Sequence, residues 1–174
     1  MHIMTLSNVT LLGAATFTGL MAGLFYSYSC SVAPALSKLP DEQYISAMQS
    51  INREIQNPVF FISFFGAIVL PPVTTYLSYS HQATAGFWLL LTATSLYLAG
   101  SFGVTALGNI PLNNALESFN LSAASKEAIS IQRLSFESRW NALNIIRTVS
   151  SILSFILILI ACLQYYSTNS SAVN

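Results

Sequence analysis

Charged and uncharged positions occupy separate blocks of this 174-residue chain. Every Lys, Arg, Asp and Glu lies within residues 38–54 or 117–147. The uncharged remainder contains four apolar runs, at about residues 9–33, 58–79, 85–107 and 141–166. Each run has about the 20 residues that an α-helix needs to cross the hydrocarbon of a bilayer. The pattern predicts an all-α integral membrane protein, a four-helix up-down bundle in a single domain over residues 1–174.

The two charged segments predict amphipathic helical connections on one side of the membrane, over about residues 40–56 and 111–138. In the first segment, apolar residues recur at helical spacing, at Tyr44, Ile45, Met48, Ile51 and Ile55. The second segment is predicted to run toward, or into, the fourth span, with Ser122 or Ser125 as a cap. Asn57, directly before Pro58, is typical of an N-cap.

Prolines and glycines mark the expected ends and bends of the spans. Pro34 is expected to close the first span. Pro71 and Pro72 predict a kink in the second span or its early end. Gly108 and Asn109 predict the end of the third span.

Composition indicates that lipid, and not water, is the solvent for much of the surface. The chain is 53% hydrophobic and 7% charged, whereas soluble domains are about 25% charged. The formal net charge of zero argues against a nucleic-acid partner. All six Lys and Arg lie on the side of the two charged connections, so the positive-inside rule places the connections in the cytoplasm and both termini outside. We therefore expect a multi-pass protein of a bacterial inner membrane. Cys30 and Cys162 lie in apolar runs and predict no disulfide.

A stripe of small residues runs along the first span. Its members are four apart, at Ala15, Gly19, Gly23, Ser27 and Ser31. Such faces let membrane helices approach closely. The stripe is compatible with a homo-oligomer interface through Ala15, Gly19 and Gly23, and also with packing inside the bundle, which is the favoured interpretation.

Arg147 is the one charged residue deep within an apolar run. It shares a helical face with Trp140, Asn144 and Ser151, and Asn141 overlaps that face. An arginine at the centre of a span costs roughly 2.5–3.5 kcal/mol on insertion scales. It must therefore point into the bundle, pair, or reach back to the boundary. The asparagines favour an inward polar pocket, in which Arg147 bonds a carboxylate or amide of 109–117 or 52–57.

Other polar groups converge on the same end of the predicted bundle. The third span is followed by the amides Asn109, Asn113 and Asn114, and the first connection carries Asn52 and Arg53. These groups are predicted to form the rim of a pocket whose floor is Arg147. The segment Tyr26 to Ser31, "YSYSCS", adds two phenols near the charged side, of which Tyr26 is the candidate for lining a cavity.

At these residues the chain resembles the anthrone oxygenase-like family of small four-helix membrane proteins. The resemblance rests on "NIPLNNAL", on W-N-x-x-N-x-x-R at the head of the last span, and on "FYSYSCSVAPAL" and "YISAMQSINREIQNPVFF". It covers about residues 10–165. Fungal members are tied to oxidation of anthrones to anthraquinones. The resemblance implies a site at Asn109, Pro111, Asn113, Trp140, Asn144 and Arg147.

The residue inventory favours chemistry without a cofactor. His2 and His81 are the only imidazoles, both on the predicted outer side, so no transition-metal or haem site is expected. No glycine-rich dinucleotide loop is present. An anthrone enolate can react with oxygen directly, and Arg147 with the amides Asn144, Asn109 and Asn113 could stabilise its oxygen.

The base for this reaction is left open. Glu54, Glu117 and Glu137 are the carboxylates available to it. Two other functions are also compatible with the sequence. One is a protein that binds a lipid, a quinone or another apolar ligand without chemistry, and the other is a structural membrane subunit.

Overall fold

The computed structural model describes residues 5–79 and 84–171, with side chains described to Tyr165. These residues are almost entirely helical and contain no strand. Four helical stretches are long and apolar enough to cross a membrane: Leu6–Leu36, Pro58–Leu77, Ala85–Glu117 and Lys126–Tyr165. The all-α fold class and the four predicted spans are confirmed.

The first span is longer than predicted because Pro34 does not end it. It consists of α1 (Leu6–Ser27), the π-helical turn η1 (Tyr28–Val32) and α2 (Ala33–Leu36). Pro34 has no N–H to donate to the carbonyl one α-helical turn earlier. The chain widens just before it, and the Ala33 N–H bonds the carbonyl of Tyr28, five residues back.

The third span repeats this arrangement around Pro111. It consists of α5 (Ala85–Leu96), η2 (Tyr97–Gly103), η3 (Thr105–Asn109) and α6 (Ile110–Glu117), of which η2 and η3 are π-helical. Asn109 has helical backbone angles, so the predicted stop at Gly108 and Asn109 is wrong. The Ile110 N–H bonds the carbonyl of Thr105, which again widens the turn before a proline.

The second span, α4 (Pro58–Leu77), is uninterrupted by its two internal prolines and does not end early. Its predicted cap is confirmed, since the side chain of Asn57 accepts a hydrogen bond from the Phe60 N–H at 3.0 Å. The Thr75 hydroxyl donates to the carbonyl of Pro71 at 2.8 Å. This is the usual bond of a Ser or Thr hydroxyl to its own helix, whereas the carbonyls that lose an N–H donor to Pro71 and Pro72 are those of Ala67 and Ile68, one turn earlier.

The connections differ from the predicted pair of interfacial helices. The first is α3 (Asp41–Glu54), close to the predicted 40–56. The second is no separate helix over 111–138. It is α6, the short turn η4 (Leu121–Ala123) and the first turns of α7 (Lys126–Ser171), which runs without a break into the fourth span. Ser125 caps α7 by accepting from the Ala128 N–H at 3.2 Å.

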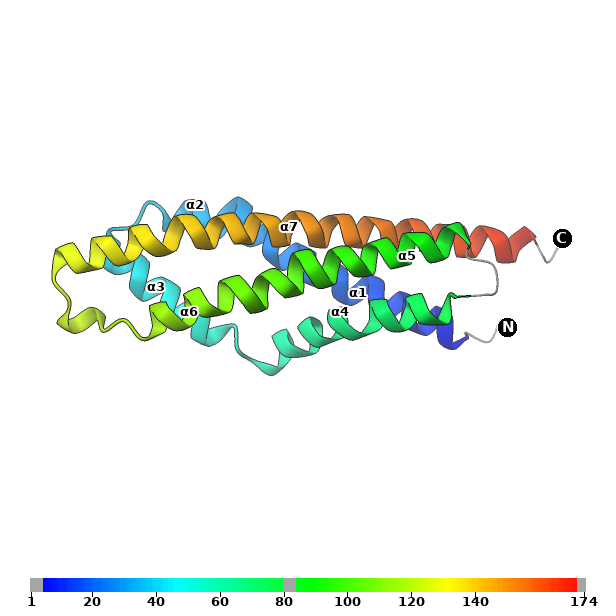
Figure 1. The fold of residues 1–174 in the computed structure, drawn as a ribbon, viewed down its shortest axis with the longest axis horizontal. Helices are drawn as coiled ribbons and strands as arrows, with labels where there is room; N and C mark the ends of the chain where they lie inside the picture. Colours follow the sequence, from blue (N-terminus) through cyan, green and yellow to red (C-terminus); the bar gives the residue numbers. More distant parts are fainter. Residues whose placement is uncertain (1–4, 80–83, 172–174) are drawn as a thin grey trace.

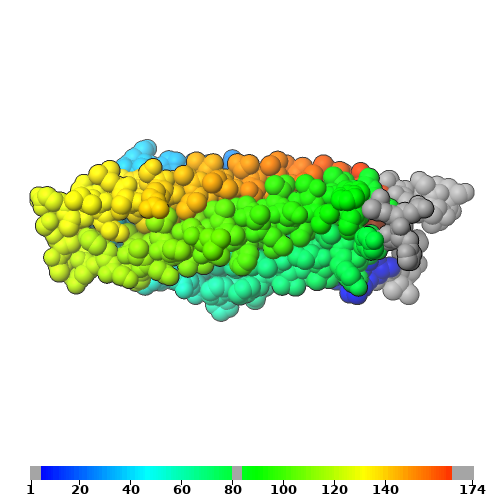
Figure 2. Space-filling model, viewed as in Figure 1, coloured from blue at the N-terminus to red at the C-terminus, as the bar shows by residue number. Residues whose placement is uncertain are grey.

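The spans form an elongated up-down bundle with both described chain ends at one end and α3 and α6 at the other (Figure 1). Helix α1 packs against α4 and α7, and α5 packs against α7 and α4. In the space-filling view the third span and α7 lie side by side along the rod (Figure 2). We call the end that carries α3 and α6 the charged end.

Three buried clusters hold the bundle together. The one at the charged end consists of Leu36, Tyr44, Ile45, Met48, Leu116, Ile129, Phe136 and Trp140. Two others lie along the spans, one around Leu11, Leu90 and Ile158 and one around Met21 and Tyr97. Large apolar side chains also face outward, among them Val59 at 77% exposure and Leu107 at 86%. This outward apolar surface is expected where lipid is the solvent.

The small-residue stripe divides between the inside and the outside of the bundle. Ala15 is buried, and a Cβ on Gly19 would lie 2.9 Å from the Phe155 ring, so both serve helix packing inside the bundle. Gly23, Ser27 and Ser31 are exposed. The favoured interpretation therefore holds for the first half of the stripe, and the homo-oligomer interface stays a prediction.

Candidate functional site

Arg147 lies inside the bundle, as its position in an apolar run predicted. The residue is 6% exposed. Its Nη2 donates to the side-chain oxygen of Asn144 at 2.7 Å, and its Nη1 makes a long contact of 3.4 Å to the Thr105 hydroxyl. The predicted partners in 109–117 and 52–57 are wrong, since neither segment bonds the guanidinium. The reason is register: Thr105 is the residue of the third span at the level of Arg147, and the amides of 109–117 lie farther toward the charged end.

Asn144 is held in one orientation by a closed set of hydrogen bonds. Its Nδ2 donates to the Ser29 hydroxyl at 2.7 Å and, at 3.4 Å, to the Phe25 carbonyl. Thr148 donates its only hydroxyl proton to the Asn144 carbonyl at 2.8 Å, so in the 3.0 Å contact between Ser29 and Thr148 the donor is Ser29. With its amide nitrogen fixed on Ser29, Asn144 must present its oxygen to Arg147.

Two aromatic rings complete the surroundings of the guanidinium. The Cζ atom of Arg147 lies 4.5 Å from the ring centroid of Phe25 and 5.1 Å from that of Trp140. Both distances are in the range of cation–π attraction, which strengthens when water is excluded. Trp140 also contacts Tyr28, with 4.5 Å between centroids. The cation therefore sits between aromatic and amide groups, all of them neutral.

No carboxylate neutralises Arg147. All six Asp and Glu residues lie in the described part of the chain, and none of its ion pairs includes this arginine. Its Nε–H also has no hydrogen-bond acceptor among the described residues. A buried charge without a partner is strongly unfavourable, costing several kcal/mol before compensation by dipoles and rings.

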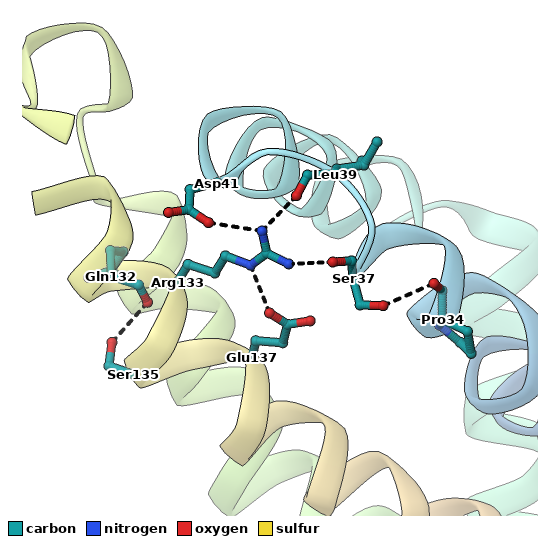
Figure 3. A network of polar contacts seen from close by, with 8 residues as sticks. All are labelled: Pro34, Ser37, Leu39, Asp41, Gln132, Arg133, Ser135 and Glu137. Atoms are coloured by element: carbon teal, nitrogen blue, oxygen red, sulfur yellow. Dashed lines mark hydrogen bonds and ion pairs between the residues drawn. The ribbon is translucent and has the colours of Figure 1, made fainter. Parts of the chain in front are cut away.

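Arg133, on the same helix, has the surroundings of an arginine with a structural role and can be compared with Arg147 (Figure 3). Its guanidinium donates to Glu137 at 2.8 Å and to Asp41 at 2.9 Å. It also donates to the carbonyls of Leu39 and Ser37, at 2.7 and 2.9 Å, where the chain turns between α2 and α3. Its Cζ lies 4.5 Å from the ring centroid of Tyr44, whose pKa is raised above the ordinary value, mainly by burial. Arg133 thus has two carboxylate partners for its charge, and Arg147 has none.

All three π-helical turns of the described chain lie around Arg147. Turn η1 supplies Ser29, η2 supplies Tyr97 and Ser101, and η3 supplies Thr105 and Asn109. On the third span, buried polar residues recur every four positions, at Tyr97, Ser101, Thr105 and Asn109. This spacing drifts around an α-helix of 3.6 residues per turn, but wider π turns keep it on one face. The four-residue spacing was the sequence signal for Tyr97, Ser101 and Thr105, which the sequence analysis missed.

This polar face carries unsatisfied groups. The side-chain oxygen of Asn109 is buried without a hydrogen-bond partner among the described residues, like the Arg147 Nε. Most buried polar atoms in folded proteins are paired, so unpaired ones call for an explanation. A ligand with its own donor and acceptor would satisfy them.

The amides Asn109 and Asn113, near the charged end of the third span, contact Trp140 and do not touch Arg147. The indole N–H of Trp140 donates to the Asn113 side-chain oxygen at 2.7 Å, and Asn109 donates to the Trp140 carbonyl at 3.5 Å. Asn114 is exposed. The predicted rim is thus a support for the aromatic wall, with Asn109 and Asn113 one contact removed from the cation.

The remaining predicted residues lie away from the guanidinium. Asn52 is buried, but its Nδ2 has no partner among the described residues. Arg53 forms an exposed ion pair with Glu117 at 2.8 Å. Tyr26 is 56% exposed and points out of the bundle, so its assignment to the cavity is wrong. The inward phenol is Tyr28, whose hydroxyl donates to the Met48 sulfur at 2.8 Å.

The predicted base candidates are not at the site either. Glu117 is held by Arg53, and Glu137 is held by Arg133. Glu54 is exposed. No group of three or more His, Cys, Asp or Glu side chains that could hold a metal ion occurs within residues 5–79 and 84–165. His2 and His81, predicted to lie on the outer side, fall outside the described residues.

A groove of about 250 Å³ leads toward the site. It runs between η1–α2 and α7 and is lined by Ser29, Ala33, Pro34, Ser37, Asn141, Asn144 and Ile145. The predicted residue Asn141 thus lines the groove, and Asn144 separates it from Arg147. A larger hollow, of about 490 Å³, lies over the exposed side of α3 and contains no site residue.

Comparison with known proteins places these residues in a family. The family model described as Anthrone oxygenase matches residues 60–157, more than half of the chain. The chain belongs to the anthrone oxygenase family. The matched segment contains Asn109, Asn113, Trp140, Asn144 and Arg147, whereas the partners Phe25 and Ser29 lie before it. No match is found among curated proteins or among solved structures.

Proposed function

We propose that this membrane protein of the anthrone oxygenase family binds a planar aromatic ketone beside Arg147 and promotes its oxidation by molecular oxygen. The observation that carries the proposal is the buried arginine with neutral partners only. An enolate oxygen would supply the missing anion. The cation would then be better paired after ionisation of the ligand than before it, which is the condition for catalysis.

The chemistry is balanced without a cofactor. An anthrone loses a proton from its central methylene carbon, and the resulting enolate oxygen is stabilised by the guanidinium. The carbon combines with O₂, the peroxide formed is protonated, and loss of water leaves the second ketone. The overall change is C₁₄H₁₀O plus O₂ to C₁₄H₈O₂ plus H₂O. Oxygen is the oxidant, and the anthrone carbon is oxidised.

The chain's own residues would act on binding and on proton affinity. Phe25 and Trp140 offer ring faces for an aromatic ligand, within about 5 Å of the guanidinium carbon. The Arg147 Nε–H is the free donor for the ketone oxygen. In this proposal the methylene proton passes to water, because Glu117 and Glu137 are held by arginines elsewhere and Glu54 is exposed. Arg147 promotes this step by lowering the proton affinity of the bound enolate.

The alternatives are a protein that binds a quinone, lipid or other apolar ligand without chemistry, and a structural membrane subunit. A quinone carbonyl would also accept from the free Nε–H of Arg147, so binding alone does not separate the first alternative from an oxygenase. Oxygen consumption separates them, because only an oxygenase consumes O₂ when anthrone is bound. A structural subunit would bind neither molecule.

The protein's setting is part of the proposal. The four apolar spans fit a multi-pass membrane protein, and the Lys and Arg bias supports a bacterial inner membrane with both termini outside. Lipid surrounds the spans. The proposed homo-oligomer interface is on the small-residue face of Ala15, Gly19 and Gly23. It would use the exposed half of that face, which is Gly23, Ser27 and Ser31.

The test uses the full-length protein in nanodiscs with anthrone. We expect one O₂ consumed per anthraquinone formed, above the rate in empty nanodiscs. Arg147→Leu should abolish the increment. Arg139→Leu is the matched control, because Arg139 lies on the same helix, is exposed and makes no ion pair among the described residues. Anthrone binding without oxygen uptake would leave the non-catalytic binder, and no binding would leave the structural subunit.

A further inference from the structure

Polar and apolar side chains line the groove beside Asn144 together. The polar ones are the hydroxyl and amide groups of Ser29, Ser37, Asn141 and Asn144. The apolar ones are Ile145, which is 58% exposed, Ala33 and Pro34. No charged side chain lines it. The Asn141 amide makes no hydrogen bond within the described chain, unlike that of Asn144.

Hydrogen bonds of the described residues join the two walls of the groove at both of its ends and not between them. At the deep end, Ser29 bonds Asn144 and Thr148. At the outer end, Arg133 of α7 bonds the Ser37 carbonyl, and the Ser37 hydroxyl bonds the Pro34 carbonyl at 3.0 Å (Figure 3). Arg133 and Asn144 are eleven residues apart on α7, or about 16 Å at 1.5 Å per residue. The groove is the stretch that these fastenings leave open.

We propose that this groove is the port through which a neutral aromatic ketone passes from the lipid layer to Arg147. The inference rests on the proposed function. The apolar side chains of the lining suit a molecule dissolved in lipid, and its uncharged polar groups suit a carbonyl oxygen but not an ion, which would have to be desolvated there. The ligand therefore passes as the ketone and ionises only beyond Asn144, whose side chain lies between the groove and the guanidinium and must swing to admit it.

A matched pair of substitutions on one short helix tests the port. Ala33 lines the groove, and Ala35, two residues later on α2, is exposed and does not. Ala33→Trp should slow anthrone association and dissociation by the same factor, about tenfold, and leave the Kd unchanged, because a port controls rates and not the final complex. Ala35→Trp should change neither rate. Stopped-flow tryptophan fluorescence in nanodiscs measures both rates.

The outcomes separate the port from the proposed function. If the unmodified protein binds anthrone and Ala33→Trp associates at the unmodified rate, the port is wrong and the function stands. If Ala33→Trp raises the Kd through faster dissociation alone, the groove is the resting site and the port is again wrong. If the unmodified protein does not bind anthrone, the function fails, and the next measurement decides the port.

Thiol labelling tests the port without the ligand. In a Cys30→Ser, Cys162→Ser background, Asn141→Cys places one thiol in the lining of the groove. We expect the neutral, lipid-soluble reagent N-phenylmaleimide to label this thiol in liposomes. Adding Ala33→Trp should slow the labelling about tenfold, which is within the range over which association rates vary among variants of one site. Added Ala35→Trp should not slow it. Equal labelling in the Ala33→Trp and Ala35→Trp proteins would overturn the port.

Discussion

The guanidinium of Arg147 and the side-chain oxygen of Asn144 lie 2.7 Å apart on the same face of α7. Asn144 is a neutral acceptor at the place where a structural arginine would meet a carboxylate. Arg133, fourteen residues earlier on the same helix, has two carboxylates and two carbonyls. The charge of Arg133 is neutralised by carboxylates within the fold, whereas the charge of Arg147 has no anionic partner in the described chain and can bind an anionic ligand.

Asn144→Asp should preserve the fold and abolish ligand binding. The new carboxylate has the shape of the amide and would pair with Arg147, so the site would no longer attract an enolate. We expect the Kd for anthrone to rise by more than about tenfold, which is about 1.4 kcal/mol. Thermal unfolding should not occur at a lower temperature. The control is Asn114→Asp, on an exposed position.

Arg147→Lys should recover only part of the activity. A lysine keeps the charge but lacks the planar fork that reaches Asn144, Thr105 and a ligand together. Arg147→Leu should in addition leave Asn144 without its donor, at a cost of about 1–3 kcal/mol in unfolding free energy. Oxygen uptake and urea unfolding in mild detergent measure the two effects. Full activity of the lysine variant would mean that only the charge matters.

Arg133→Gln should destabilise the protein much more than Arg53→Gln. Arg133 has a side chain that is 12% exposed and four hydrogen-bond partners, and losing bonds to charged groups costs about 1.5–3 kcal/mol. Arg53 and Glu117 are 56% and 44% exposed, and such surface pairs contribute about 0–1 kcal/mol. Thermal unfolding of the two variants in the same detergent gives the comparison. Equal losses of stability would contradict the structural role of Arg133 at the turn between α2 and α3.

Gly100→Ala should separate the third span from α7. A Cβ at position 100 would lie 2.6 Å from the Cβ of Ser150, so one of the helices must shift. Overpacking of this kind typically costs about 1–3 kcal/mol. Adding Ser150→Gly should restore much of the stability, since it removes the atoms that collide. A double variant no more stable than Gly100→Ala would mean that the two residues do not set the helix spacing.

Cysteine labelling from outside the cell tests the proposed orientation. Ala85→Cys lies at the end of the bundle that carries the described chain ends, and Lys126→Cys lies at the charged end. In the Cys30→Ser, Cys162→Ser background, a membrane-impermeant maleimide should modify the first and spare the second. The reverse pattern would place the charged connections outside.

The sequence by itself determined the four spans and favoured an inward direction for Arg147. Both follow from the cost of placing charge in lipid, which is the same wherever the neighbouring helices lie. Charges confined to 38–54 and 117–147 leave only four apolar blocks. In the fourth block, Arg147 and Asn144 would both be energetically unfavourable if they faced lipid, so an inward direction is favoured.

Only the tertiary structure decided which groups surround that charge. Tyr26 and Tyr28 have similar sequence surroundings, yet Tyr26 is exposed and Tyr28 contacts Trp140, because the orientation of the first span sends two nearby positions to different faces. Asn109 did not end its helix, because packing against Trp140 outweighs a weak local preference for a stop. The register of separate helices, with π turns before Pro34 and Pro111, brought Phe25 and Thr105 against Arg147 and brought Ser29 against Asn144. Such long-range register depends on how the helices pack together, and no local pattern in the chain encodes it.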